Sequence, residues 1–452
     1  MLMQKLTAIG AAMALTVSVA WAEVSATEAA RLGKTLTPVG AEMAGNAAGT
    51  IPAWNGGITQ PVAGLKPGAH YPDPFAQDKP LFTIDAGNME KYRANLSPGQ
   101  MALLKKYPDW KMNVYPARRS ASYPKAYYDE TIANATRAKL AANGNGVTGV
   151  NAGTPFPIPQ NGLEAIWNHL MRYSGDAYAE NWSQAAVTRG GDYTLVRFEY
   201  EYEFHYGNLS KPQSEREENK LFNFLQRVTA PARLAGYVLL VHEYADQVRQ
   251  PRKAWTYNPG QRRVRLAPNV AYDNPGTAAD GLRTNDDFAM YNGATDRYNW
   301  KLVGKQEIYI PYNSYKLMSH EIKYADILKP GHINPEHARY ELHRVWVVDA
   351  TLKPGTSHIY ARRTFYIDED SWAILLIDKY DGRGELWRTA EFHNENWYNV
   401  PMFFGTLEIH NDLQSGRYIA MGLRNEEKLI YEPIKRSAGD YTPANLRGTG
   451  TR

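Results

Sequence analysis

The stretch from Tyr340 to His393 divides into four strand-like runs, and no other feature constrains the fold of this chain as strongly. The four runs span residues 340–352, 358–367, 372–380 and 385–393. Turn-forming residues separate them, as in Lys353-Pro-Gly-Thr356 and Asp381-Gly-Arg-Gly384. Connections this short join antiparallel strands, because a parallel pair needs a crossover of about a dozen residues or more. The pattern therefore predicts an antiparallel meander.

Residues 191–205 predict another strand, because their character alternates from one position to the next. Mostly apolar and aromatic residues hold the even positions: Thr194, Val196, Phe198, Tyr200, Tyr202 and Phe204. Charged residues stand between them: Arg197, Glu199, Glu201 and Glu203. We expect one buried and one solvated face. Further strand-like runs lie at residues 237–244, 253–257, 262–266, 306–310 and 315–318.

Three helices are expected before this β-rich region. The first is capped by Ser97 and ends at Tyr107, the second spans about residues 129–142, and the third begins at Asn161. The third is the most amphipathic, with an apolar stripe of Leu163, Ile166, Trp167, Leu170 and Met171. That stripe either packs on the sheet as core or covers a ligand pocket as a lid. Because helical segments precede the strands, we expect an α+β protein with one large, curved antiparallel sheet.

The first 22 residues predict a secretory signal peptide. Lys5 precedes an apolar run from Leu6 to Val19, and a small-x-small site ends at Ala22. A membrane anchor is the alternative, but the run is shorter than the roughly 20 residues that cross a bilayer. We therefore divide the chain into a signal peptide (1–22), a Pro/Gly-rich arm (23–159), a β-rich domain (160–432) and a tail (433–452).

Composition and motifs exclude several classes of function. There is no cysteine, hence no lipidation site, disulfide or thiol nucleophile, and 51 basic against 47 acidic residues give no reason to expect nucleic acid. Motifs of serine hydrolases, zinc proteases and P-loops are missing from the sequence. The one G-x-G-x-x-G, at residues 144–149, follows a predicted helix rather than a strand and is expected to be a loop. The acidic turn Asp368-Glu-Asp370 is expected to be a solvated loop tip. We therefore predict no enzyme, no catalytic residue, no metal ligand and no cofactor.

The candidate ligand-binding residues are aromatic and basic. A predicted hairpin carries Trp255, Tyr257, Arg263 and Arg265. Phe288 and Trp300 follow it, and the amphipathic helix contributes Trp167 and Leu170. Guanidinium groups beside aromatic rings suit a ligand with an apolar body and an anionic head. The alternative is that the basic hairpin balances the charge of the acidic pair Asp286-Asp287 and binds no ligand.

Several runs resemble an uncharacterised family of exported proteobacterial proteins, the domain of unknown function 1329. The resemblance rests on residues 253–265, 340–348, 365–372 and 380–387, with residues 36–42 and 46–54 similar to its amino-terminal signature. That family is similar in fold to the lipoprotein carriers LolA and LolB, which implies an incomplete β-barrel whose mouth is closed by helices. Family members are often encoded beside resistance-nodulation-division (RND) exporters and an outer-membrane protein family, and the family has no established catalytic residues.

Together these observations predict a periplasmic binding or carrier protein for a lipid or another hydrophobic molecule. The resemblance implies that it serves an RND-type exporter or outer-membrane trafficking, with association to the outer membrane left open. This chain is more than twice as long as a LolA-type carrier, and it lacks the lipidation cysteine of LolB. One alternative is a structural or adaptor subunit of an envelope transport assembly with a filled core. A glycan-binding or glycan-cleaving protein is another, supported by the 31 tyrosines and 11 tryptophans.

Overall fold

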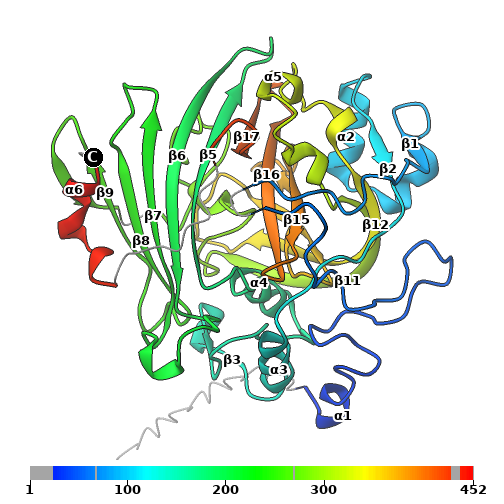
Figure 1. The fold of residues 1–452 in the computed structure, drawn as a ribbon, viewed down its shortest axis with the longest axis horizontal. Helices are drawn as coiled ribbons and strands as arrows, with labels where there is room; N and C mark the ends of the chain where they lie inside the picture. The colour runs from blue at the N-terminus through cyan, green and yellow to red at the C-terminus, as the bar shows by residue number, and fades with distance from the viewer. Residues whose placement is uncertain (1–23, 67–68, 268–269, 429–437, 451–452) are drawn as a thin grey trace, which may run out of the picture.

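One 15-stranded sheet organises the computed structural model, which describes residues 24–66, 69–267, 270–428 and 438–450 (Figure 1). In chain order the strands are β1 (Phe82–Ile84), β2 (Met112–Val114), β5 (Ala177–Val187), β6 (Tyr193–Phe204), β7 (Lys220–Ala230), β8 (Val238–Tyr244), β9 (Lys253–Asn258), β10 (Arg263–Leu266), β11 (Tyr298–Pro311), β12 (Tyr340–Leu352), β13 (Arg362–Asp368), β14 (Ile374–Tyr380), β15 (Leu386–Trp397), β16 (Met402–Asp412) and β17 (Tyr418–Leu423). A separate pair contains β3 (Lys139–Leu140) and β4 (Val147–Thr148).

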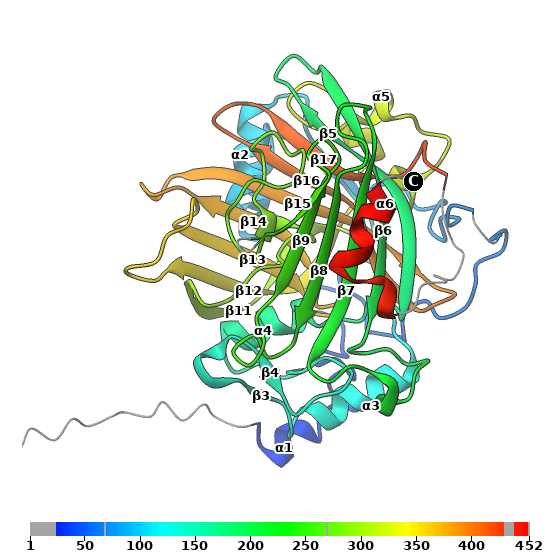
Figure 2. The ribbon, with the colours of Figure 1, turned by 90° about the vertical axis from the view of Figure 1, so that its left-hand side faces the viewer.

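The sheet is curved and open, and its strands follow the order β1-β2-β12-β13-β14-β15-β16-β17-β5-β6-β7-β8-β9-β10, with β11 paired to β12. The predicted meander β12–β15 is confirmed, and pairing is antiparallel except where β2 meets β12. We call β5–β10 the first wall and β11–β17 the second wall. Figure 2 shows the strands of the two walls running in steeply different directions. Within the described residues, β1 and β10 at the two ends do not pair, so the sheet stays open.

The helices are few and short. They are α1 (Ala26–Ala29), α2 (Pro98–Lys106), α3 (Lys125–Asn134), α4 (Gly162–Leu170), α5 (Tyr324–Ile327) and α6 (Leu446–Gly450). Single 3₁₀ turns are η1 (Met89–Asn95), η2 (Ala142–Gly144), η3 (Gln213–Glu215), η4 (Asn285–Asp287), η5 (Tyr315–Met318), η6 (Pro335–His337), η7 (Ala438–Asp440) and η8 (Pro443–Asn445). No helix in the described ranges has the length and apolar character needed to span a bilayer.

Two of the three helix predictions are confirmed, and two local predictions are wrong. The capping box of α2 joins Ser97 and Gln100, and Asn161 caps α4. The helix expected at 129–142 begins at Lys125 and ends at Asn134, whose side chain donates to two backbone carbonyls outside the helix. Residues 315–318 form η5 rather than a strand, because a short apolar run has no periodicity that separates the two structures.

The amino-terminal arm covers the outer face of the second wall, along the right and lower parts of Figure 1. Leu104, Trp110 and Met112 of the arm pack with Tyr309 and Tyr340 of β11 and β12. The strands beneath are therefore buried on both faces, and every residue of β14 is buried. The predicted signal peptide lies outside the described residues. The described part of the tail forms η7, η8 and α6, and α6 lies on the outer face of the first wall (Figure 2).

The helix α4 lies between the walls and belongs to both apolar clusters. Ala165 and Ile166 pack with the second wall, whereas Leu163 and Trp167 pack with the aromatic side chains of the first wall. Since all four side chains are buried, the apolar stripe seen in the sequence does serve as core. The chain leaves α4 at Met171 and enters the space between the walls, where the candidate site lies.

Candidate ligand-binding chambers

Three adjoining cavities lie between the two walls. Chamber A, of about 70 Å³, lies against β5, β6 and β15–β17, and chamber B, of about 80 Å³, lies against β5–β7 and the residues that follow α4. Chamber C, of about 40 Å³, lies against β7, β8 and residues 270–292. Tyr202 lines all three, while Arg172, Ser174 and Tyr178 line both A and B. Neighbouring chambers therefore share part of their lining.

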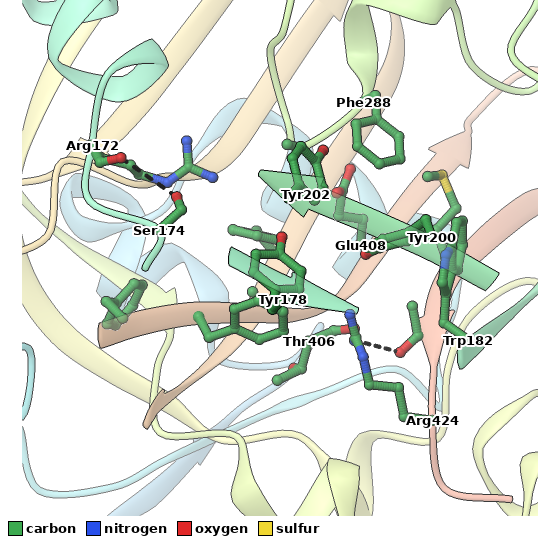
Figure 3. Close-up of a pocket in the computed structure, with 17 residues that line it drawn as sticks. Arg172, Ser174, Tyr178, Trp182, Tyr200, Tyr202, Phe288, Thr406, Glu408 and Arg424 are labelled. Atoms are coloured by element: carbon green, nitrogen blue, oxygen red, sulfur yellow. Dashed lines mark hydrogen bonds between the residues drawn. The ribbon is translucent and has the colours of Figure 1, made fainter. Parts of the chain in front are cut away.

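Aromatic side chains from several strands form the chamber walls (Figure 3). The alternation of β6 turns Tyr200 and Tyr202 inward, where Tyr202 packs 4.7 Å from the ring of Phe224 and 5.2 Å from that of Tyr178. Such rings supply large apolar faces while their polar edges stay available to a ligand. The chambers thus offer aromatic faces interspersed with polar groups.

Three tyrosine hydroxyls have no protein partner in this site. Among the residues that the structure describes, none forms a hydrogen bond with the hydroxyl of Tyr178, Tyr200 or Tyr202. Burial raises the pKa of all three tyrosines well above the usual value, so each hydroxyl keeps its proton. These groups can donate hydrogen bonds to a guest molecule or to water.

Three charged side chains line chamber A. In Figure 3, Arg172 and Arg424 lie on opposite sides of the tyrosines. Arg424 forms a buried ion pair with Glu180 and donates to the carbonyl of Thr406 at 2.5 Å. Glu408 accepts a hydrogen bond from the Met290 amide at 3.2 Å, and a ring nitrogen of His410 lies 3.4 Å from its carboxylate.

Two of the eight sequence-predicted ligand residues line a chamber. Phe288 lines A and C, and Leu170 lines B. Trp167 is buried nearby and donates to the carbonyl of Gly144 at 3.0 Å, whereas Trp300 packs against Tyr291 and Phe365. These two tryptophans support the core around the chambers.

The predicted hairpin lies apart from the chambers. Trp255 and Tyr257 face outward and pack in a cluster with Tyr441 and Leu446 of the tail. Arg263 and Arg265 are exposed on β10 at the edge of the sheet. The predicted hairpin is present as β9 and β10. Its position in the sheet depends on strand pairings that the sequence does not reveal. Ligand contact by these residues stays a prediction.

Sequence reasoning missed the residues at the centre of the site. Tyr200 and Tyr202 were expected on the buried face of their strand but were not singled out as ligand contacts. Arg172 follows directly on the amphipathic helix, so its place beside a pocket was open to prediction from that helix. Tyr178 belongs to β5, which was missed entirely because Ala177–Val187 mixes small, charged and aromatic residues without clear alternation.

The acidic turn 368–370 is buried, so the expectation of a solvated tip is wrong. Asp368, Glu369 and Asp370 are only 0%, 2% and 4% exposed, because the arm covers them. Arg119 of the arm binds both oxygens of Asp370, at 2.7 and 2.8 Å. Burial, and next the charge of Asp370, raises the pKa of Asp368 to about 6.

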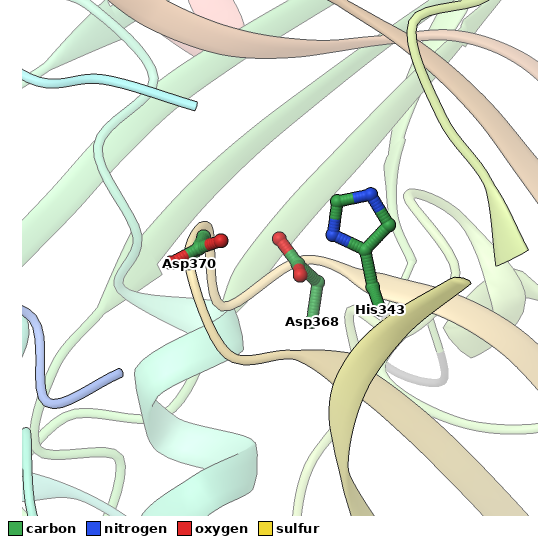
Figure 4. A group of neighbouring side chains, drawn as sticks. All are labelled: His343, Asp368 and Asp370. Carbon is green, nitrogen blue, oxygen red and sulfur yellow. The ribbon is translucent and has the colours of Figure 1, made fainter. Parts of the chain in front are cut away.

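Asp368, Asp370 and His343 could together hold a metal ion. One ligand atom from each lies within 4.8 Å of the others, and Figure 4 shows the three side chains facing one another. One imidazole and two carboxylates form a donor set that suits a divalent ion. However, the guanidinium of Arg119 already neutralises Asp370 and uses both its oxygens. This cluster therefore already has a structural role, which is to hold the arm on the second wall.

The sequence of this chain matches a protein family and a relative of nearly the same length. The model of the family described as "Protein of unknown function (DUF1329)" matches residues 83–447. The uncharacterized protein PA3922 of Pseudomonas aeruginosa is 54% identical over 443 residues, covering 98% of this chain and 97% of its own length.

Two solved structures are also similar. One is a Vibrio parahaemolyticus domain named for outer membrane lipoprotein sorting, with TM-score 0.43 and 13% identity, covering 63% of this chain and 98% of its own. The other is a LolA superfamily protein from Nitrosomonas europaea, with TM-score 0.34 and 14% identity, covering 56% of this chain and 85% of its own. On the family match and the curated relative, this chain is a member of the DUF1329 family.

Proposed function

We propose that this protein binds and carries a hydrophobic molecule in the bacterial envelope, and that it works in the periplasm after residues 1–22 are removed. The observation that carries the proposal is the set of adjoining chambers lined by aromatic side chains, with Tyr202 shared by all three. Concave, mostly apolar sites with a few polar groups are typical of small-molecule binding. In the same proposal, α4 closes the end of the incomplete barrel.

The energetics of such binding need no reactive group. Burying an acyl chain contributes about 0.8 kcal/mol per CH₂, so a ten-carbon tail would gain roughly 8 kcal/mol before the costs of association. The separate chambers are smaller than such a tail. Rotation of Tyr178 and Tyr202, which neighbouring chambers share, would join the chambers into one elongated pocket.

The small chamber volumes are also the observation that favours the alternative, an adaptor that docks on a transport assembly without a ligand. Partnership with an RND-type exporter and an outer-membrane protein rests on the family resemblance alone. The glycan-cleaving alternative has less support. Glycoside hydrolysis uses two carboxylates, and Glu408 is the single carboxylate among the described residues that line the three chambers.

The test is native mass spectrometry of the exported protein, purified without detergent from a bacterial host, followed by organic extraction. We expect a reproducible adduct that extracts as a hydrophobic compound. Ser174→Trp should fill chambers A and B and abolish the adduct, whereas Ala177→Trp, three residues further on at an exposed position, should keep it. An unliganded mass for the wild-type protein, with no uptake of added lipid, would favour the adaptor.

A further inference from the structure

The cation that lines both chambers A and B, Arg172, is half-buried and differs in its partners from most of the buried arginines of this protein. Its position is fixed by a hydrogen bond from Nη1 to the carbonyl of His169 at 2.7 Å. The ring nitrogens of His169 lie 3.4 Å from the same Nη1. Burial, and next the charge of Arg172, holds the pKa of His169 well below its usual value, so the imidazole is neutral. The contacts with His169 therefore supply no negative charge to balance that of Arg172.

Within the described part of the chain, no carboxylate forms an ion pair with Arg172. Several fully buried arginines do have such partners: Arg119 with Asp370 at 2.7 Å, Arg363 with Asp286 at 2.9 Å and Arg388 with Asp412 at 3.0 Å. Burial lowers the pKa of Arg172, whereas Glu180 raises that of Arg424 despite its burial. Arg172 shares its lack of an ion pair with Arg283, which stacks on Phe288 in chamber C.

The surroundings of Arg172 differ on its two sides. Toward chamber A the nearest acidic group is Glu408, which is already engaged by the Met290 amide and His410. Toward chamber B the lining has no carboxylate, and Arg172 is its one charged residue among those described. Ser174 and the hydroxyls of Tyr178 and Tyr202 lie in the same lining. A partly desolvated charge without an ion pair is costly unless a counter-ion arrives.

We propose that Arg172 is the anchor for an anionic head group, and that the ligand is a single-chain amphiphile bearing a carboxylate or phosphate. This inference rests on the proposed carrier function and names the class of its ligand. The planar guanidinium binds such a head through two parallel hydrogen bonds, and the tyrosine hydroxyls donate to the lone pairs that its oxygens have left. The apolar tail lies in chamber B along Tyr202 and Phe222.

Calorimetric titration of the full exported chain with three twelve-carbon probes tests whether Arg172 binds an anionic head group. Dodecanoate and dodecyl phosphate carry the anionic head, and dodecanol shares the tail without the charge. We expect the wild-type protein to bind both anions at least about 10-fold more tightly than dodecanol. Arg172→Gln should weaken binding of the anions by about 10- to 100-fold and leave dodecanol unchanged. A preference for one anion over the other identifies the head as carboxylate or phosphate.

A matched control and a stability measurement separate ligand contact from a structural role. Arg383→Gln, in the exposed turn between β14 and β15, should leave all three affinities unchanged. Arg172→Gln should melt no lower than the wild-type protein, because it removes a half-buried charge that has no ion pair among the described residues. Equal binding of all probes by the wild-type protein and Arg172→Gln would overturn the head-group assignment and leave the carrier function standing. Failure of every probe to bind the wild-type protein would overturn both.

Discussion

The two walls of this sheet are made of similar strands but bury their charges in different ways. On the first wall, β6 alternates between inward aromatic residues and outward charges such as exposed Arg197. On the second wall, β14 is buried on both faces, and it carries Asp378 and Lys379 with no exposure at all. The difference arises because the arm covers the outer face of the second wall, so charges there must find partners inside the protein.

The partners found on the second wall join distant parts of the chain. Asp378 accepts a hydrogen bond from the Gly99 amide of the arm at 3.0 Å, and Lys379 pairs with Asp287 at 2.8 Å. Polar groups on the second wall therefore hold the arm outside and the loop that carries Phe288 inside. Aromatic rings of the first wall line all three chambers, whereas those of the second wall line chamber A alone among the three. The first wall thus contributes to more of the chamber lining.

The largest effect should come from breaking the link between arm and second wall. Arg119→Ala leaves the buried Asp370 without its cation, while Glu369 keeps Lys305 and Arg344, and we expect a loss of about 3–5 kcal/mol in the free energy of unfolding. Urea denaturation measures it. The control is Arg197→Ala on the first wall, whose half-exposed side chain pairs with Glu427 and should contribute less than about 1 kcal/mol. Equal losses for both variants would contradict the contrast drawn here.

A pH-dependent effect should come from Glu391 of β15. Burial raises its pKa to about 7 in the folded protein, above the unfolded value of about 4.5. The folded state therefore holds a proton more tightly, and the stabilisation that this provides is complete below about pH 4.5 and lost as the pH rises through 7. Glu391→Gln should gain up to about 3 kcal/mol relative to wild type between pH 4.5 and 8.

Urea titrations of both proteins at several pH values in this window give that difference. The raised pKa of Glu395, also about 7 and also caused by burial, is present in both proteins and cancels in the comparison. A difference between variant and wild type that stays constant with pH would show that Glu391 ionises normally.

The smallest effect is expected when one tyrosine hydroxyl is removed from each wall and the two losses of stability are compared. Tyr340 of β12 donates to Glu391 at 2.9 Å, so Tyr340→Phe should cost about 1–3 kcal/mol by leaving a buried oxygen without its partner. Tyr202→Phe on the first wall removes a hydroxyl that has no partner among the described residues, and should change stability by less than about 0.5 kcal/mol. Thermal melting of each variant beside the wild-type protein measures both changes in stability. A clear loss for Tyr202→Phe would place its hydroxyl in the structural network instead of the site.

Much of the fold was accessible from local pattern. The turns between residues 340 and 393 predicted four antiparallel strands, and Ser97 and Asn161 correctly marked where helices begin, because these signals act over a few residues. The strand β16 (Met402–Asp412) was missed because both its faces are buried, which removes the period-two alternation. The acidic turn was misread for the same reason, since nothing within 368–370 indicates that Arg119, some 250 residues earlier in the chain, covers it.

By itself the sequence determined the fold class, the antiparallel meander and the supply of aromatic side chains, because periodicity and turn chemistry are local properties of the chain. Only the tertiary structure decided which aromatic rings line the chambers and which arginines line them without an ion pair among the described residues. Arg172 and Arg263 look alike in the sequence, yet one lines two chambers and the other lies at an exposed edge. That distinction depends on which strands pair and which face the arm covers, and both are settled by contacts between residues far apart in the chain.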